Sequence, residues 1–83
     1  MKDITKDELM NVMKKMDHRN RNNFDSFAGS IKQINEMLSV QKIEDIIDYF
    51  VFELFLNSDA DLYELGQYEL GKITSGINSI IND

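Results

Sequence analysis

The sequence predicts an all-α protein, a small antiparallel helical bundle that forms a single helical domain over residues 1–83. Three observations lead to this fold class. Proline is absent, only four glycines occur, and the apolar residues recur at helical rather than alternating spacing. We expect three long helices and one or two short ones, and the short connections between them favour antiparallel neighbours.

The first two helices have recognisable starts and apolar stripes. Thr5 followed by Glu8 forms a capping-box pattern, which predicts a helix over residues 6–17. The polar, Asn-rich stretch over residues 17–23 then predicts a loop. Gly29 lies inside the second helix, where a close contact between helices is one use for it. The second helix is marked by one broad apolar stripe, made by Phe24, Phe27, Ala28, Ile31, Ile34, Met37 and Leu38.

The third helix is expected at the centre of the bundle, because it is apolar around much of its circumference. Ser39 ends the second helix and is a candidate cap for the third, which follows the helical period over residues 40–56. A short helix over residues 59–65 is expected next, with Gly66 as its left-handed stop. The last segment is amphipathic but weakened by two glycines, and its apolar positions are Tyr68, Leu70, Ile73, Ile77, Ile80 and Ile81.

The charge of the chain is strongly asymmetric. Residues 1–42 hold eight Lys and Arg against six Asp and Glu, a balance of +2. Residues 43–83 hold one Lys against nine Asp and Glu, a balance of −8, so this half accounts for the net charge of −6. A small protein with so acidic a half is suited to binding a positively charged partner.

No pattern of catalytic or cofactor-binding residues occurs in the sequence, so we expect a protein that is not an enzyme and uses no cofactor or metal. Cysteine is absent and His18 is the only histidine, which leaves no thiolate, metal cluster or serine triad. A stretch that starts like a calcium loop at Asn57 has Leu62 where the loop needs glycine and Tyr68 where it needs glutamate. Glycine-rich phosphate loops are missing.

The composition also indicates where the protein works and what it does not bind. The longest apolar stretch covers residues 46–56 and contains Asp48 and Glu53, whereas a membrane span needs about 20 apolar residues. Residues 1–5 lack the apolar core of a secretory signal, so we expect a cytoplasmic protein that does not bind membranes. The acidic balance argues against binding nucleic acid, although the basic stretch over residues 14–21 keeps that alternative open.

We expect the binding surface to consist of acidic and aromatic side chains in the second half of the chain. Tyrosine gives a large contact area at low entropic cost, and carboxylates pair with Lys or Arg on a partner. The leading candidates are Asp59, Asp61, Tyr63, Glu64, Tyr68 and Glu69, followed by Asp45, Asp48 and Glu53. The alternative interpretation is that the acids form an ordinary solvated face and the tyrosines belong to the core.

A short pattern in the last third of the chain resembles a known family. The run Phe55-Leu-Asn-Ser-Asp59-Ala-Asp61, followed by Leu70, Ile73, Ile77 and Ile80, is similar to the C-terminal part of colicin D-type immunity proteins. The resemblance implies a small acidic helical bundle that blocks a tRNA-cleaving toxin. It also implies that the acidic residues from Asp59 onward make the contacts with that toxin.

The predicted function is therefore that of a non-enzymatic inhibitor with a basic protein partner. The most concrete form is an immunity protein that neutralises a nuclease-type bacterial toxin through an acidic surface. A phage-encoded anti-defence inhibitor would use the same physics. A different class is a helical self-association or scaffold module, a homodimer in which the apolar side of the third helix pairs two copies through Tyr49, Phe52 and Leu56.

Overall fold

The computed structural model describes residues 2–15, 24–53 and 66–83. In these ranges the protein is all-α, as predicted, and no described residue belongs to a β-strand. The predicted short helix over residues 59–65 lies outside the described residues. The helices are α1 at Lys6–Lys14, α2 at Phe24–Ile34, α3 at Val40–Val51 and α4 at Gln67–Ile81.

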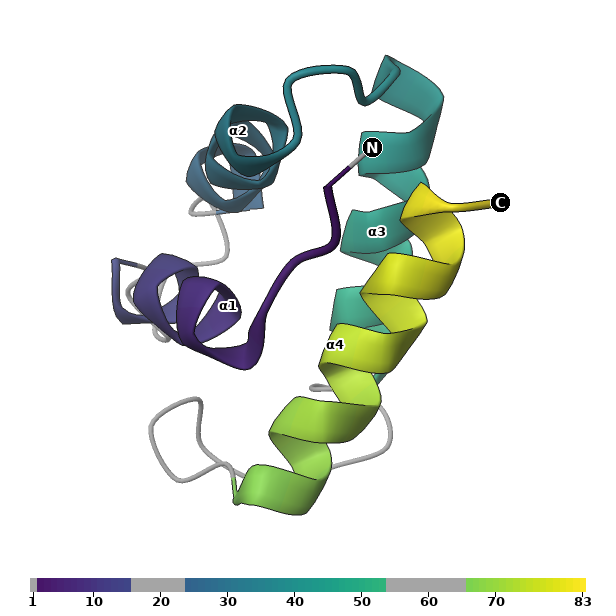
Figure 1. The fold of residues 1–83 in the computed structure, drawn as a ribbon. Coiled ribbons are helices and arrows are strands. Elements are labelled where there is room, and N and C mark those ends of the chain that lie inside the picture. The colour runs from purple at the N-terminus through teal and green to yellow at the C-terminus, as the bar shows by residue number, and fades with distance from the viewer. Residues whose placement is uncertain (1, 16–23, 54–65) are drawn as a thin grey trace.

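The helices form two pairs, with the segment before α1 running between them (Figure 1). α3 and α4 lie side by side and run antiparallel, whereas α1 and α2 lie across them on the other side of that segment. The main contacts form a ring, in which α1 contacts α2 and α4, and α3 contacts α2 and α4. The ends of the described chain meet, because Asn82 Nδ2 donates a hydrogen bond to Asp3 Oδ1 at 2.7 Å.

The segment before α1 is held in the bundle by a pair of hydrogen bonds to α4. Asn78 Oδ1 accepts from the Ile4 backbone N–H at 2.8 Å, and Asn78 Nδ2 donates to the Ile4 carbonyl at 2.9 Å. The Ile4 side chain is buried in the core. Because both backbone groups of Ile4 have partners, this extended segment can lie inside the protein without an unsatisfied polar group.

Two helix starts are fixed by the capping residues that the sequence predicted. Thr5 Oγ1 accepts from the Glu8 backbone N–H at 3.1 Å at the start of α1. Ser39 Oγ accepts from the Lys42 backbone N–H at 3.2 Å at the start of α3. The Glu8 carboxylate also accepts a hydrogen bond from the Thr5 hydroxyl at 3.4 Å. Each such cap stabilises a helix by about 1 kcal/mol.

The core contains a stacked pair of aromatic rings. Phe27 of α2 and Phe50 of α3 lie with their centroids 4.4 Å apart and their planes at 27°. Such a pair contributes about 0.5–1.5 kcal/mol beyond the burial of its area. The buried apolar side chains come from every helix, as the helical periods of the sequence predicted, and are Ile4, Leu9, Val12, Met13, Phe27, Ile31, Leu38, Ile43, Ile46, Phe50, Leu70, Ile73, Ile77 and Ile81.

Three local predictions are wrong. α2 ends at Ile34 rather than at residue 38, because a turn that closes from the Leu38 N–H to the Asn35 carbonyl at 3.1 Å leads Leu38 into the core. Met37, predicted in the apolar stripe, is consequently 81% exposed.

The other two corrections concern glycines. Gly66 is the N-cap of α4 with extended φ of −74° and ψ of 172°, not a left-handed stop. Gly29 makes no close helix contact, because an added side chain there would meet no described atom within 4 Å.

Candidate functional site

The structure separates the predicted partner-binding residues into groups. Four of them lie outside the described residues, namely Asp59, Asp61, Tyr63 and Glu64. Of the others, Asp45 and Asp48 lie on α3, Glu53 lies just beyond the end of that helix, and Tyr68 and Glu69 lie in the first turn of α4. The described part of the predicted surface is therefore centred on α3 and the start of α4.

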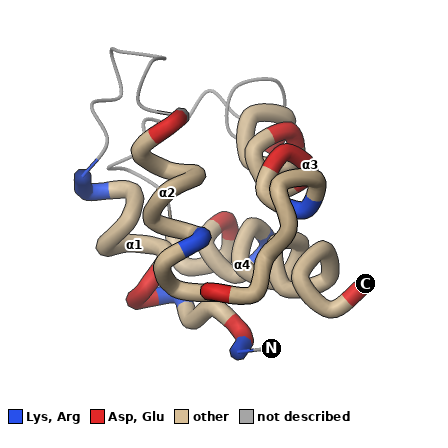
Figure 2. Tube along the Cα trace, turned by 90° about the horizontal axis from the view of Figure 1, so that it is seen from above, with Lys and Arg blue, Asp and Glu red and all other residues tan. Residues whose placement is uncertain are grey.

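α3 carries an acidic face, which we define as Glu44, Asp45 and Asp48. All three side chains are exposed, whereas the core side of the same helix is buried. Figure 2 shows the acidic positions following one another along α3, while acids and bases are mixed around α1 and the N-terminal segment. Gln41 Nε2 donates to Asp45 Oδ1 at 3.1 Å, but no described Lys or Arg forms an ion pair with the acidic face.

Glu44 belongs to the acidic face but is not among the residues predicted from the sequence. The signal was present, because Glu44 precedes Asp48 by four residues, which places the two carboxylates on the same side of a helix. Like charges at this spacing destabilise a helix by about 0.2–0.5 kcal/mol. Asp48 also lies in the last turn of α3, where the macrodipole disfavours an anion. The acidic face therefore does not stabilise the helix that carries it.

Lys42 is the basic residue of α3, and it is engaged elsewhere. Its ammonium donates to the Ile81 carbonyl at 2.7 Å and to the Asp83 carbonyl at 2.8 Å. A cation at this position satisfies the carbonyl of the last residue of α4 and interacts favourably with the dipole of that helix. The ammonium thus ties the start of α3 to the end of α4 and leaves the acidic face without a neighbouring counter-charge among the described residues.

Glu53 belongs to the contact between α3 and α4. Its carboxylate forms an ion pair with Lys72 at 3.1 Å, and its side chain is only 12% exposed. The Tyr49 hydroxyl donates to the Lys72 carbonyl at 3.0 Å. Two causes raise the pKa of Tyr49, of which burial is the larger and the negative charge of Glu53 is the smaller. Glu53 also raises the pKa of Lys72, mainly through the hydrogen bond between the two side chains and secondly through its negative charge. Tyr49, predicted on a self-association face, therefore contacts α4 instead.

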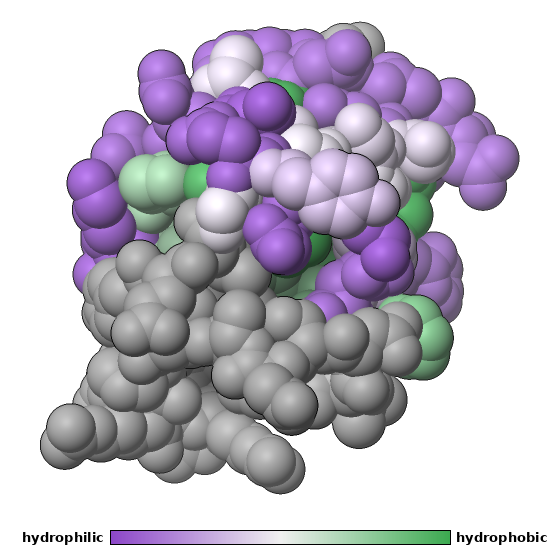
Figure 3. Space-filling view, turned by 90° about the horizontal axis from the view of Figure 1, so that it is seen from below, coloured by the Kyte–Doolittle hydropathy of each residue, from purple (hydrophilic) through white to green (hydrophobic). Residues whose placement is uncertain are grey.

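The start of α4 exposes a tyrosine beside a carboxylate. Tyr68 is 80% exposed, so the interpretation that the tyrosines belong to the core does not hold for it. The Glu69 carboxylate folds back toward Gly66, where an added Cβ would lie 2.8 Å from Oε2. An acid in the first turn is favoured by the helix dipole, so Glu69 also stabilises α4. Seen from below, the described surface is mainly hydrophilic with small separate hydrophobic areas (Figure 3).

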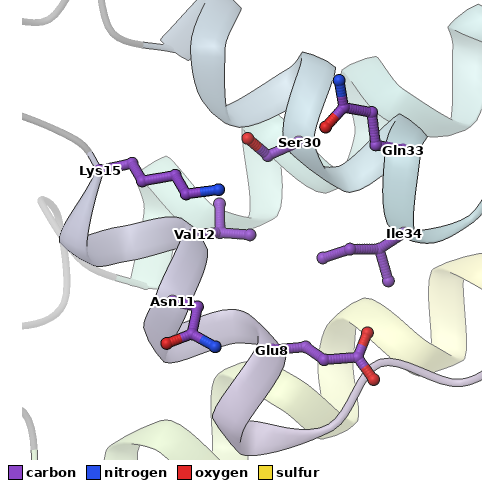
Figure 4. A pocket seen from close by; sticks show the side chains of 7 residues that line it. All are labelled: Glu8, Asn11, Val12, Lys15, Ser30, Gln33 and Ile34. Carbon is purple, nitrogen blue, oxygen red and sulfur yellow. The ribbon is translucent and has the colours of Figure 1, made fainter.

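Two hollows border α2, and no sequence pattern predicted either of them. The first lies between α1 and α2 and has a volume of about 180 Å³; Figure 4 shows Lys15 and Glu8 at its opposite ends with Val12 between them. The second lies at the end of α2, has a volume of about 410 Å³, and shares Gln33 and Ile34 with the first. Its lining residues are Lys2, Gln33, Ile34, Asn35, Glu36 and Met37.

Other site classes find no support in the described ranges. No group of three or more His, Cys, Asp or Glu residues in residues 2–15, 24–53 and 66–83 could hold a metal ion. None of the described helices combines the length and the apolar character needed to cross a membrane. Of the basic stretch over residues 14–21, only Lys14 and Lys15 are described, and both are exposed.

Comparison with known proteins gave no match to a protein-family model, a curated protein or a solved structure. Two features call for an explanation beyond the fold, namely the acidic face of α3, which has no ion-pair partner among the described residues, and the hollow at the end of α2.

Proposed function

We propose that this chain is a non-enzymatic, cytoplasmic binding protein that inhibits a basic protein through the acidic face of α3. The observation that carries the proposal is the position of Glu44, Asp45 and Asp48, which are exposed and have no ion-pair partner among the described residues. Helix energetics do not account for them, because two of the three repel each other and one opposes the helix dipole. A partner with Lys or Arg side chains would relieve both penalties.

An apolar side chain lies next to the acidic face. Phe52 follows Asp48 by four residues and keeps helical backbone angles, φ −59° and ψ −50°, so the two side chains are neighbours on one face. Phe52 is 49% exposed, so about half of its ring surface is accessible to a partner. An aromatic anchor beside charges that steer the partner is the arrangement that binding hot spots use.

The most concrete form of the proposal is an immunity protein that neutralises a nuclease-type bacterial toxin. Nuclease clefts are positively charged because they hold phosphate, so a rigid acidic helix can occupy such a cleft in place of the substrate. The resemblance to colicin D-type immunity proteins supports this form, and so does the net charge of −6. An anti-defence inhibitor encoded by a phage would use the same surface.

The test compares two variants of equal charge. Glu44→Gln, Asp45→Asn and Asp48→Asn together neutralise the acidic face, while Asp7→Asn, Asp25→Asn and Glu36→Gln together neutralise three exposed acids elsewhere. Each triple variant changes the net charge from −6 to −3. The immobilised wild-type chain is first used to capture partners from an extract of the source cells at low salt, and the captured protein is identified and purified.

Association of the captured protein with each variant is then measured at several salt concentrations. We expect the acidic-face variant to associate about tenfold or more slowly at low salt and to lose most of its salt dependence, whereas the control stays close to wild type. Equal rates for the two triple variants would contradict the proposal, as would the capture of no basic protein. For the toxin form, an equimolar amount of the chain must also abolish the activity of the captured nuclease.

Self-association is the second candidate function, and the exposure of Phe52 is the observation that favours it. In this case a copy of the same chain, rather than a basic protein, would cover Phe52. Tyr49 does not add to such a face, because it packs against α4. Sedimentation velocity distinguishes the two functions. A homodimer that dissociates on Phe52→Ser would favour self-association, whereas a monomer would favour contact between Phe52 and the basic partner protein.

A further inference from the structure

The exposed side of α3 carries apolar residues at both ends of its acidic face. Val40, four residues before Glu44, is 69% exposed, and Phe52, four residues after Asp48, is 49% exposed. The Phe52 backbone N–H donates to the Asp48 carbonyl, so the helical turn continues as far as Phe52. Side chains that follow one another at intervals of four residues form a ridge along a helix. We define the exposed ridge as Val40, Glu44, Asp48 and Phe52.

The exposed ridge has the dimensions that helix packing requires. From Val40 to Phe52 it extends about 18 Å along the helix axis, at about 1.5 Å per residue. Ile47 and Val51 lie three residues after the two acids of the ridge, and both are half-buried, so the groove beside the ridge has an apolar floor. Helices pack by fitting the ridges of one into the grooves of the other. The exposure of the ridge shows that α2 and α4, the main neighbours of α3, leave it uncovered.

The charges of this surface select a basic occupant. The acids follow one another along α3 (Figure 2), and they have no ion-pair partner among the described residues. Lys42 is bound to the end of α4, and Lys72 is paired with Glu53, so neither supplies the missing counter-charge. The same face of a second copy would bring acids against acids, which is unfavourable. Lys or Arg side chains on another protein complement the acidic face.

The backbone of α3 favours a helix over an extended segment as the occupant. Inside α3 the backbone N–H and C=O groups are bonded to one another, so the helix surface offers no partner to the backbone of an extended chain. A helix brings no such requirement, because its own backbone groups are already paired. Its side chains also recur at intervals of three and four residues, which is the spacing of the groups on the exposed ridge.

We propose that the exposed ridge docks a basic α-helix of the inhibited protein, which deepens the proposed function and rests on it. Lys or Arg side chains in the middle of that helix pair with the acidic face. Apolar side chains toward its two ends pack against Val40 and Phe52. The basic residues and the apolar residues of the docked helix therefore lie on one side of it, in the order apolar, basic, apolar.

The probe is a synthetic alanine-based helical peptide of about 18 residues. Its one-sided form carries three arginines in the middle and a leucine toward each end, all on one side of the helix. The scrambled form has the same composition, but its arginines and leucines are distributed around the helix. Each peptide is titrated into the isotope-labelled chain and followed by the backbone amide signals in nuclear magnetic resonance. We expect the one-sided peptide to cause saturable shifts along the exposed ridge and the scrambled peptide to bind about tenfold more weakly.

Variants at the two ends of the exposed ridge test its apolar contacts. Val40→Ser and Phe52→Ser should each weaken the one-sided peptide about tenfold and leave the scrambled peptide unaffected. Tyr68→Ser is the matched control, because Tyr68 is 80% exposed in the first turn of α4 and lies off the ridge, so this variant should bind like wild type. Val40 and Tyr68 are both largely exposed, so their substitution should leave the chain folded, which urea denaturation checks for all three variants.

Docking of a helix is excluded if the one-sided peptide causes no saturable shift, if the two peptides bind equally, or if either end variant binds the one-sided peptide like wild type. Shifts confined to the residues that line the hollow at the end of α2 would exclude it as well, because none of them lies on α3. The proposed function has its own readout in the captured basic protein. It survives these failures if neutralising the acidic face still slows association with that protein, and it fails if the acidic-face variant associates like its control.

Discussion

Gly76 allows α4 to lie against the Tyr49 ring of α3. A Cβ atom added at Gly76 would overlap Cζ, Oη and Cε1 of that ring. The same ring donates its hydroxyl hydrogen bond to the Lys72 carbonyl at 3.0 Å, one turn earlier in α4. Gly76→Ala must therefore push the ring away from α4 and break this bond, although alanine is the better helix former.

The expected magnitude follows from three contributions. Displacing a packed side chain costs about 1–3 kcal/mol, and losing the hydrogen bond costs about 0.5–1.5 kcal/mol. The higher helix propensity of alanine than of glycine offsets about 1 kcal/mol of this loss of stability. Central values give a net loss of about 2 kcal/mol for Gly76→Ala, which corresponds to a fall in Tm of about 8–16 °C for a domain of this size.

Urea denaturation followed by far-UV circular dichroism measures this loss, and Gly29→Ala is the matched control. Gly29 is exposed inside α2 with no described atom near an added Cβ, so its substitution should stabilise the chain by about 0.5–1 kcal/mol. In a Tyr49→Ala background, Gly76→Ala should become stabilising as well. A free energy of unfolding for Gly76→Ala equal to that of wild type would contradict this prediction. An equal loss of stability with and without the Tyr49 ring would contradict it as well.

Two further predictions concern a helix cap and a titrating group. Ser39→Ala removes the side chain that accepts from the Lys42 N–H, and it should lower the free energy of unfolding by about 1 kcal/mol in urea denaturation. Ser79→Ala, at an exposed position inside α4, should leave it unchanged or slightly higher, and equal losses at both sites would exclude a capping role. The pKa of Tyr49 is raised from its ordinary value of 10.0 in the folded chain, so the unfolded chain loses this proton first. The stability that Tyr49 contributes is thus complete below pH 10 and declines as the pH rises through the folded pKa. Tyr49→Phe should cost about 0.5–1.5 kcal/mol at neutral pH and should flatten this alkaline decline, which denaturation at a series of pH values will show. If the free energy of unfolding of Tyr49→Phe falls as steeply with rising pH as that of wild type, the decline is caused by other groups, such as Lys72.

Much of the fold could be predicted from local patterns. Thr5 and Ser39 accept hydrogen bonds from the backbone N–H groups three residues later in the chain. The helical period of the apolar residues likewise relates positions only three or four residues apart. These interactions lie within one turn of the chain, so the sequence alone determined the helical class, two helix starts and most of the core. The same short range placed Asp45 and Asp48 on one face of α3, and it could also have placed Glu44 there.

The prediction of α2 failed where a local preference competed with a distant contact. The apolar stripe continued to Met37 and Leu38, but the chain turns after Ile34 so that Leu38 alone reaches the core. Gly66 was likewise assigned by its usual local role, whereas it begins α4 in an extended conformation. A stripe of apolar residues shows which side of a helix is buried, but it does not show where the helix must end to meet its neighbours.

Only the tertiary structure decided which polar groups are left free for a partner. Lys42 satisfies the end of α4, 39 residues away, and Lys72 pairs with Glu53 across the α3–α4 contact, so the acidic face of α3 is left without a described counter-charge. The contact of Gly76 with Tyr49 also arises between segments far apart in the chain. The physical reason is that pairing and burial depend on distances in space, whereas the sequence specifies only the charges and the period along each helix.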